Sequence, residues 1–314
     1  MWDRAMRQGV LAISGQPAVE RYARTAPWMR RLVDRFVAGE TVDDAITVVR
    51  AIATQGMTAT LDHLGENVRT ETAANAAGAT YRDVLRRLAA AGLEPCISVK
   101  LTMLGLAFDD RVPESILMSI LEDARAVGGF VRVDMEGSAY TERTLDMVER
   151  LHARFPEQVG GVIQAYLYRS PADIERLIAR RIRVRLVKGA YAEPASIAYQ
   201  RPRDIDAAYV RLMERLLDDG PYPAIATHDP ALLRSARGYA TRMGIGRDRF
   251  EFQMLYGVRC DEQRSLTADG YRMRVYVPFG TEWYPYFTRR IAERPANALF
   301  VLRQLLDRGE PAHR

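Results

Sequence analysis

The sequence predicts a (βα)8 barrel of the TIM type, preceded by an N-terminal helical arm. From Met57 onward, eight short apolar or β-branched runs alternate with amphipathic helical segments, which is the order of a parallel sheet with crossover helices. Polar residues stand directly after these runs, where barrel enzymes place their sites. The length of 314 residues suits a single barrel, and no linker or low-complexity segment interrupts the chain.

The N-terminal arm is predicted at residues 1–56, and the barrel with its C-terminal helices at residues 57–314. Ala18–Val37 is a helical segment with many arginines. Thr41–Arg50 is a second helix, with Thr41 as its N-cap and acidic residues in its first turn, where the helix dipole favours negative charge. Both segments precede the alternation of strands and helices, so we expect them to lie outside the barrel units.

The predicted barrel contains eight strands and the helices that connect them. The strands are expected at Met57–Leu61, Pro95–Val99, Phe130–Val133, Gly161–Ala165, Val184–Val187, Ala224–Thr227, Phe250–Met254 and Met273–Val277. Helices are expected at Tyr81–Ala91, Ile116–Val127, Thr144–Phe155, Asp173–Arg181, Ala207–Asp218 and Ala231–Met243. Eight parallel strands are the number that closes a TIM barrel, and an open doubly wound sheet is the alternative.

The composition indicates a globular protein without a disulfide framework. Hydrophobic residues make up 48% of the chain and charged residues 27%, so a large core can form without cross-links. Cys96 and Cys260 are the only cysteines, which indicates a reducing compartment, and we expect a cytoplasmic protein. No apolar run is long enough to span a bilayer, and the first residues lack a signal-peptide pattern.

The basic residues are distributed in an unusual way. The net charge of +5 permits attraction to anionic surfaces, but the arginines are spread along the chain, so contact with a membrane face is favoured over nucleic-acid binding. Lysine occupies only two of the 45 basic positions, Lys100 and Lys188. Each follows an apolar run, CISVK and VRLVK, which favours a site that needs a compact ammonium rather than a planar guanidinium.

Polar side chains stand at the C-terminal ends of the predicted strands, in or just after the last residues, and the last strand ends in a Pro–Gly turn. They are, in order, Asp62, Lys100, Asp134, Gln164, Lys188, Thr227 with His228, Gln253, and the Pro278–Gly280 turn. A single polar residue at a strand end is as often a satisfied structural group as a functional one. Polar residues at every strand end are difficult to explain by packing, so they favour an active site at this end of the barrel.

The strand predicted at Met273–Val277 leads into a helix. Pro278 and Gly280 are expected to stop the strand abruptly. Pro285 suits the first position of the helix, where its missing N–H costs nothing. The helix is expected to last until Arg294, because the proline that follows disfavours helical geometry in the residue before it.

This helix offers a receptor for a small carboxylate. Tyr286, Arg289, Arg290 and Glu293 are three or four residues apart and therefore share one face. Phe287 lies beside that face and is expected to anchor the helix to a core. A guanidinium meets a carboxylate with two hydrogen bonds at once. The alternative is a solvated helix with one Arg289–Glu293 ion pair, and the strand and turn before the helix favour the receptor.

Several common motifs are absent from the sequence. No GxGxxG follows a predicted strand, and there is no GxxxxGK[ST] phosphate loop, no HExxH and no GxSxG. The four histidines and two cysteines show no metal-ligand spacing, so no metal site is expected. On the barrel alone, a lyase with Lys188 or Lys100 as a Schiff-base nucleophile, or a binding module without activity, would be the alternative functions.

Seven segments occur in an order that is known from one family. They are LGE at Leu64–Glu66, SVKLT at Ser98–Thr102, RVDMEGS at Arg132–Ser138, IQAYL at Ile163–Leu167, RLVKGAY at Arg185–Tyr191, ATHD at Ala226–Asp229 and YVPFGTEWYPYFTRRIAE at Tyr276–Glu293. In these segments the chain resembles the proline dehydrogenases, and the resemblance spans about residues 57–300. RLVKGAY, followed by the helix with the tyrosine and the double arginine, is a highly specific combination.

The resemblance implies a distorted (βα)8 barrel that holds FAD over the C-terminal ends of its strands. It implies oxidation of L-proline to Δ1-pyrroline-5-carboxylate by hydride transfer to flavin N5, the first step of proline catabolism to glutamate. Electrons would pass to a membrane quinone, so the protein is expected at the cytoplasmic face of the inner membrane. A separate pyrroline-5-carboxylate dehydrogenase would use the product, because the compact length is similar to that of the bacterial single-function members.

The resemblance also assigns roles by matching position. The catalytic residues would be Asp134 and Arg185, with Arg185 near flavin N5. The substrate carboxylate would be held by Lys100, Arg289 and Arg290. The proline ring would be enclosed by Leu186, Tyr191, Tyr276 and Tyr286. The residues that bind FAD would be Met135, Gln164, Arg185, Lys188, Gly189, Ala190, Thr227, His228 and Glu293. Glu66 would pair with Arg289 as a gate over the pocket.

Two positions refine this expectation. Tyr276 matches the aromatic residue of the proline-specific members, so L-proline rather than hydroxyproline is the expected substrate. Ala192 stands where the family often has tryptophan or another large residue, which leaves the contacts to the outer part of FAD open. Three cations around one carboxylate exceed what charge balance requires, so nearby acidic residues are expected to offset the excess.

Overall fold

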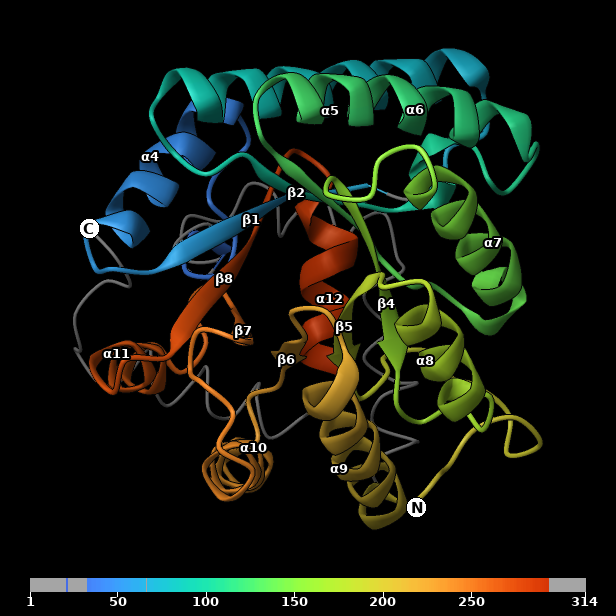
Figure 1. Cartoon of the computed structure of the whole chain (residues 1–314). Helices are drawn as coiled ribbons and strands as arrows, with labels where there is room; N and C mark the ends of the chain where they lie inside the picture. Colours follow the sequence, from blue (N-terminus) through green and yellow to red (C-terminus); the bar gives the residue numbers. More distant parts are fainter. Residues whose placement is uncertain (1–20, 22–32, 66, 294–314) are drawn as a thin grey trace.

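The computed structural model describes residue 21, residues 33–65 and residues 67–293 of the chain. Within these residues, eight parallel strands close into a barrel in the order of the sequence (Figure 1). Each strand pairs with the next one along the chain, and β8 pairs with β1 to complete the ring. The closed barrel confirms the predicted fold class and rules out the open doubly wound sheet.

The strands lie close to their predicted positions. They are β1 (Thr58–His63), β2 (Cys96–Val99), β3 (Phe130–Val133), β4 (Val159–Gln164), β5 (Arg183–Val187), β6 (Ala224–Ala226), β7 (Glu251–Leu255) and β8 (Arg272–Phe279). Every strand end falls within two residues of the expected one. The apolar and β-branched runs therefore define the barrel wall well.

Helices surround the barrel wall (Figure 1). The α-helices are α4 (Val42–Ala53), α5 (Glu71–Ala90), α6 (Arg111–Ala126), α7 (Thr141–His152), α8 (Ser170–Ala179), α9 (Pro202–Asp219), α10 (Pro230–Arg242), α11 (Cys260–Ala268) and α12 (Trp283–Glu293). Two short 3-10 helices, η1 (Leu101–Leu104) and η2 (Ser138–Tyr140), follow β2 and β3. We did not predict α11, whose short segment CDEQRSLTA has few apolar residues.

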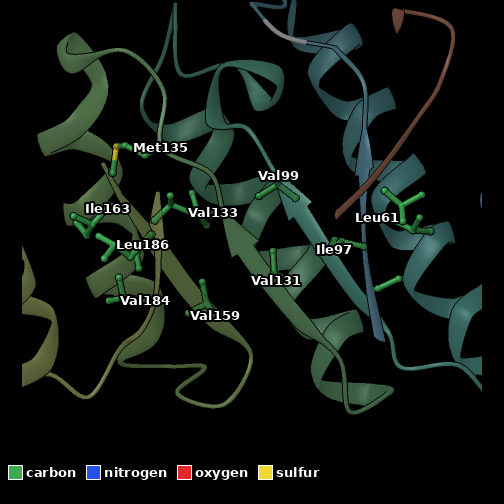
Figure 2. Close-up of a cluster of buried hydrophobic side chains, with 14 of the residues drawn as sticks. Leu61, Ile97, Val99, Val131, Val133, Met135, Val159, Ile163, Val184 and Leu186 are labelled. Atoms are coloured by element: carbon green, nitrogen blue, oxygen red, sulfur yellow. The ribbon is translucent and has the colours of Figure 1, made fainter. Parts of the chain in front are cut away.

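Side chains on the strands alternate between two layers. Apolar side chains such as Val133, Ile163 and Leu186 lie in the outer layer, between the strands and the helices (Figure 2). Polar side chains occupy inward positions, and even Arg132 and Glu251 are buried. The barrel interior is therefore a packed polar core inside an apolar shell.

Gly160 on β4 makes room for a guanidinium inside the barrel. A Cβ at this position would stand 2.5 Å from the carbonyl oxygen of Arg183 and 2.7 Å from Nη1 of Arg132. Nη1 of Arg132 donates hydrogen bonds to the carbonyl oxygens of Gly161 (3.1 Å) and Arg183 (2.7 Å). The absent side chain thus lets the backbone of β4 and β5 satisfy a buried arginine.

The end of β8 differs from the expectation that Pro278 stops the strand. β8 continues to Phe279, and its last two residues still pair with β1 in register. Pairing with β7 ends at Tyr276, so the missing N–H of Pro278 falls beyond that ladder. The Pro278 carbonyl oxygen accepts a hydrogen bond from the N–H of Ala38 at 2.8 Å. α12 then begins at Trp283, two residues before the expected start.

Helix α4 belongs to the helical layer around the barrel. It begins at the predicted N-cap Thr41, which forms a capping box with Asp44. Its buried residues, among them Ile46 and Ile52, join the main core, and the helix packs on β1 and β8. We expected this helix in an N-terminal arm before the barrel units, and in the structure it covers the seam that closes the barrel. Most of the helix predicted at Ala18–Val37 lies outside the described residues.

Candidate active site

The C-terminal ends of the strands carry a network centred on Asp134, which follows β3. Its Oδ1 accepts hydrogen bonds from Nη1 of Arg185 (2.7 Å) and Oγ of Ser98 (3.2 Å). Its Oδ2 accepts one from the Tyr276 hydroxyl (2.8 Å) and lies 3.7 Å from Nζ of Lys100. Side chains from four strands meet at one carboxylate because parallel strands end at the same edge of the barrel.

Lys100 lies between two carboxylates. Its Nζ is 2.8 Å from Oδ1 of Asp62, and its side chain is only 14% exposed. Burial alone would lower the pKa of Lys100, but the charges of Asp62 and Asp134 raise it above its ordinary value. Burial raises the pKa of Asp62, which the Lys100 ammonium opposes and the Asp134 charge adds to. Lys100 is therefore a fixed cation rather than a neutral amine.

Arg185 is buried and anchored at two of its nitrogen atoms. Nη1 donates to Asp134, and Nε donates to Oε1 of Gln253 at 2.6 Å. Its guanidinium carbon lies 5.2 Å from the centre of the Tyr276 ring, within range of a cation–π interaction. Nη2 is buried and has no hydrogen-bond partner among the described residues. This donor can serve a group bound at the barrel mouth.

Lys188, just after β5, is neutralised by two acidic residues that sequence reasoning missed. Its Nζ lies 2.5 Å from Oδ1 of Asp206 on α9 and 2.9 Å from Oδ2 of Asp229. Burial would raise the pKa of Asp229, but hydrogen bonds from Lys188 and the N–H of Ala231 bring it below its ordinary value. Asp229 is the N-cap of α10 and the last residue of ATHD, a signal that could have identified it.

Gln164, at the end of β4, joins the loops that follow β3 and β5. Its Nε2 donates to the carbonyl oxygen of Glu136 (2.9 Å), and its Oε1 accepts from the N–H of Ala190 (3.4 Å). The buried carboxylate of Glu136 accepts hydrogen bonds from the N–H and Oγ1 of Thr102, at 3.1 and 2.5 Å. Glu136 is a third acidic residue at this end of the barrel, after Asp206 and Asp229, that the sequence pattern did not single out.

The KGAY segment after β5 packs closely at the same end of the barrel. Gly189 has a φ of +122°, and a Cβ there would lie 2.3 Å from the Tyr166 ring, so glycine alone fits. Ala190 is exposed, while Tyr191 is half-buried. A Cβ on Gly137, in the loop after β3, would be 4.0 Å from the Tyr191 ring. The loops after β3 and β5 therefore lie against each other.

Thr227 and His228 hold the loop between β6 and α10. Oγ1 of Thr227 accepts the N–H of Asp229 (3.1 Å), and Nε2 of His228 accepts the N–H of Leu255 (2.9 Å). Because Nε2 is an acceptor, the neutral imidazole carries its proton on Nδ1. His228 thus connects the loop after β6 to the end of β7, whereas the hydrogen bond of Thr227 stays within that loop.

Two expected site residues have their side chains in the outer apolar layer. Leu186 is 0% exposed, and its neighbour Arg185 faces the barrel interior, so Leu186 faces the helices (Figure 2). The expectation that Leu186 encloses the substrate is therefore wrong. Met135 is also buried in this apolar cluster, at 7% exposure.

Leu255 is an inward-facing residue that sequence reasoning missed. It lies at the end of β7, two residues after Gln253, and pairs in register with Tyr276 on β8. Its side chain is half-buried. Counting alternate residues along β7 from Gln253 would have found this apolar side chain at the mouth.

The first turns of α12 pack on the end of β1. Tyr286 and Phe287 are both buried, in a cluster that also contains Leu64 and Val37. Phe287 thus lies in a core, as expected, and the role of Tyr286 in enclosing a ligand stays a prediction. The packing seats α12 at the C-terminal end of the barrel, next to the residue that follows β1.

The side chains of four expected site residues lie outside the described part of the structure. Arg289, Arg290 and Glu293 lie on α12, but their side chains fall outside the described part of the structure. Glu66 also lies outside the described residues. The carboxylate receptor on α12, and the gate between Glu66 and Arg289, therefore stay predictions.

The described part of the chain has neither a membrane-spanning helix nor a cluster of metal ligands. None of its helices is long and apolar enough to cross a membrane. No group of three or more His, Cys, Asp or Glu side chains in this part is placed to hold a metal ion.

A closed barrel with cations and carboxylates converging at the C-terminal ends of its strands has the arrangement of a TIM-barrel enzyme. A family model described as proline dehydrogenase matches residues 45–303. The proline dehydrogenase of Deinococcus radiodurans is 41% identical over 310 residues, covering 98% of this chain and 99% of the relative. Proline dehydrogenase 1 of Bacillus subtilis strain 168 is 39% identical over 301 residues, covering 96% and 99%. The chain belongs to the proline dehydrogenase family and is an oxidoreductase.

A solved structure shows the same architecture. The crystal structure of proline utilization A (PutA) from Bdellovibrio bacteriovorus superposes with a TM-score of 0.81 at 27% identity. The match covers 90% of this chain and 35% of that one. The chain thus corresponds to about a third of the longer protein and to nearly all of the two bacterial proline dehydrogenases.

Proposed function

We propose that the chain oxidises L-proline to Δ1-pyrroline-5-carboxylate with FAD as its cofactor. The observation that carries this proposal is the set of contacts that Asp134 makes with Arg185, Tyr276 and Lys100 at the barrel mouth. Family membership supports proline as the substrate. A Schiff-base lyase is disfavoured because its nucleophile must be a neutral amine, whereas two carboxylates raise the pKa of Lys100.

The substrate carboxylate needs cations, and the ring needs a wall that excludes water. Lys100 would donate to the carboxylate together with Arg289 and Arg290, since an ammonium and two guanidiniums offer charged donors from different directions. The ring would be enclosed by Tyr191, Tyr276, Tyr286 and the half-buried Leu255. Glu66 and Arg289 would form the gate over this pocket.

Asp134 and Arg185 are the residues we propose at the reacting centre. Asp134 already accepts three hydrogen bonds, so its main task would be to fix Arg185 and Tyr276 rather than to act as a free base. Holding the substrate in one orientation against these groups would supply much of the rate enhancement. Arg185 would add a fixed positive charge beside the reacting atoms.

The side chains at the mouth fit a flavin. The buried Nη2 of Arg185 has no hydrogen-bond partner among the described residues, so it can donate to a cofactor atom. The exposed Ala190 and the Gly189 without a side chain follow Lys188 directly, so this loop offers little bulk against a bound ligand. We propose that FAD is held by Gln164, Arg185, Lys188, Gly189, Ala190, Thr227, His228 and Glu293, and by the backbone of Met135, whose side chain lies in the outer apolar layer. When bound, FAD supplies the acceptor for the hydride that leaves C5 of proline.

We further propose a membrane quinone as the electron acceptor, with the protein at the cytoplasmic face of the inner membrane. The net charge of +5 supports contact with anionic lipid. A separate pyrroline-5-carboxylate dehydrogenase would use the product. The chain spans only 25% of the bifunctional PutA of Escherichia coli, which is consistent with a second activity residing elsewhere.

The purified protein tests this proposal. We expect a yellow protein with one FAD per chain that, with L-proline and a dye or quinone acceptor, yields a product trapped by o-aminobenzaldehyde. Cosedimentation with vesicles of anionic lipid, lost when salt is added, would test membrane contact separately. A colourless protein that borohydride links covalently to a keto substrate would contradict the proposal in favour of a Schiff-base enzyme.

A further inference from the structure

A second set of polar and charged side chains fills the barrel interior below the active site. Glu251 and Gln253 occupy successive inward positions on β7, and Arg274 occupies one on β8. Their exposures are 3%, 4% and 8%, so all three are buried. On the other side, β6 presents Ala224 and Ala226 in register with the two β7 residues, and these small side chains leave room for longer ones.

Hydrogen bonds join this set to Arg185. Nε of Arg185 donates to Oε1 of Gln253 at 2.6 Å, and Nε2 of Gln253 donates to Oε1 of Glu251 at 2.5 Å. Nε of Arg274 donates to both carboxylate oxygens of Glu251, at 3.0 and 3.1 Å. Nη2 of Arg274 then reaches Glu94 at 2.8 Å, near the opposite end of the barrel. The chain of contacts thus runs from the mouth to the base.

The chemistry of the two ends fixes the orientation of the Gln253 amide. A guanidinium only donates hydrogen bonds, and an ionised carboxylate only accepts them. The amide oxygen must therefore face Arg185, and the amide nitrogen must face Glu251. Arg274 supports this arrangement because it holds the pKa of Glu251 below its ordinary value, although burial alone would raise it. A flipped amide would place donor against donor and acceptor against acceptor.

Two anchors define the plane of the Arg185 guanidinium. Asp134 holds Nη1 and Gln253 holds Nε, and because the group is flat, these two contacts also determine where Nη2 points. With Asp134 alone, the group could pivot about a single hydrogen bond. Nη2 is the nitrogen without a partner among the described residues. A group bound at the mouth would accept a hydrogen bond from Nη2, so this interaction depends on where Nη2 points.

We propose that Gln253, held by Glu251 and Arg274, is a positioning residue that sets the orientation of Arg185 at the reacting centre. None of the three touches the substrate, and their effect passes through Arg185. The proposal rests on the proposed function, since it requires Arg185 to act beside the flavin and proline. It adds a buried chain of contacts on β7 and β8 to the residues that control the reaction.

The first test is Gln253→Met, which removes the hydrogen-bond acceptor for Nε of Arg185 and keeps a side chain of similar size. We expect the rate of anaerobic flavin reduction by L-proline to fall about 10- to 100-fold, as for a small misplacement of a catalytic group. The apparent dissociation constant for proline should change little. The flavin midpoint potential should become more negative, because the fixed cation no longer faces the reduced ring. Thr60→Val is the control, since it removes another buried polar group of the barrel interior, one that contacts Cys96.

A second test exchanges the two β7 side chains. Gln253→Glu alone places two carboxylates together. Glu251→Gln alone leaves Nε of Arg274 facing a neutral amide, with Glu94 as the remaining charge partner of Arg274. The double variant restores every donor–acceptor match. A glutamate at position 253 accepts from Arg185, and a glutamine at position 251 donates to that glutamate and accepts from Arg274. We expect the exchange to recover about tenfold or more of the rate lost in Gln253→Glu, and to move the potential back toward that of the parent.

The outcomes separate this proposal from the proposed function. If proline does not bleach the unmodified protein, the proposed function fails. If it does, and Gln253→Met matches Thr60→Val in both rate and potential, the positioning role is wrong. Should Gln253→Met fail to fold, the exchange variant decides: recovery of rate and potential supports the role, and a folded double variant no better than Gln253→Glu overturns it.

Discussion

The ammonium of Lys100 lies 2.8 Å from Oδ1 of Asp62 and 3.7 Å from Oδ2 of Asp134, so two carboxylates share one cation. Lys188, the other lysine of the chain, is likewise paired with two carboxylates. An ammonium has three N–H groups that point in different directions, whereas a guanidinium fork suits one planar partner. The geometry therefore explains why lysine stands at these two positions in a chain otherwise rich in arginine.

Removing one of these carboxylates should change the pH dependence of the enzyme. Asp62 helps to raise the pKa of Lys100 above its ordinary value, so the ammonium persists to higher pH than a free lysine. In Asp62→Asn the pKa of Lys100 should fall. If Lys100 binds the substrate carboxylate as proposed, proline binding is then lost as the pH rises through the lowered pKa. We expect kcat/KM of the variant to decline at alkaline pH where that of the parent does not.

The matching control is Asp123→Asn, which removes the partner of Arg82 in a more exposed ion pair. Its kcat/KM should follow the parent at every pH, because exposed pairs contribute little. Identical alkaline limbs for Asp62→Asn and the parent would show that Asp62 does not support the charge of Lys100.

Tyr276 should control which ring the site accepts. Tyr276→Ser opens space at the mouth, so we expect the ratio of kcat/KM for 4-hydroxyproline over L-proline to rise. Tyr276→Phe keeps the ring and loses the 2.8 Å hydrogen bond to Asp134. That loss of about 0.5–1.5 kcal/mol should lower activity a few-fold without changing selectivity. Equal selectivity in all three proteins would rule out Tyr276 as the specificity residue.

Arg290 should serve substrate binding rather than cofactor retention. Arg290→Met would remove the proposed two-pronged contact with the substrate carboxylate, and such a charged contact is worth about 1.5–3 kcal/mol, so we expect KM for proline to rise roughly 10- to 100-fold. The FAD content should be unchanged. Arg87→Met, which breaks a surface contact with Asp43 on α4, is the control and should leave KM as it is. A variant with normal KM would remove the arginine pair from the site.

The glycine pair of β4 provides a test of the polar barrel interior. Gly160→Ala would push a Cβ to 2.5 Å from the Arg183 carbonyl oxygen and 2.7 Å from Nη1 of Arg132. We expect the free energy of unfolding, measured with urea, to fall by about 1–3 kcal/mol from overpacking. Gly161→Ala meets nothing closer than Val148 at 3.8 Å and should not destabilise the fold. Equal stability of the two variants would contradict the described packing of Arg132.

Local patterns in the sequence predicted the barrel wall and the positions at its mouth. Outward-facing residues such as Val131 and Val133 alternate with polar ones such as Arg132, and this period of two is visible without the structure. The same rule applied to β5 would have excluded Leu186 from the site. Applied to β7, it would have added Leu255.

Partners that come from distant segments could not be predicted in this way. Asp206 reaches Lys188 from α9, and Gln253 reaches Arg185 from β7, so only closure of the barrel brings them together. The position of α4 over the closing seam depends in the same way on tertiary packing. Pro278 remains in a strand because pairing with β7 has already ended there, which its own residue type does not reveal.

The most direct test of the central claim is the visible spectrum of the purified protein under anaerobic conditions, before and after L-proline is added. We predict flavin absorbance that bleaches with L-proline and persists with D-proline, because the fixed charges of Lys100 and Asp134 at the barrel mouth would, in the proposed site, hold a chiral substrate in one orientation. A protein without flavin absorbance, or one whose flavin stays oxidised in excess L-proline, would contradict the account.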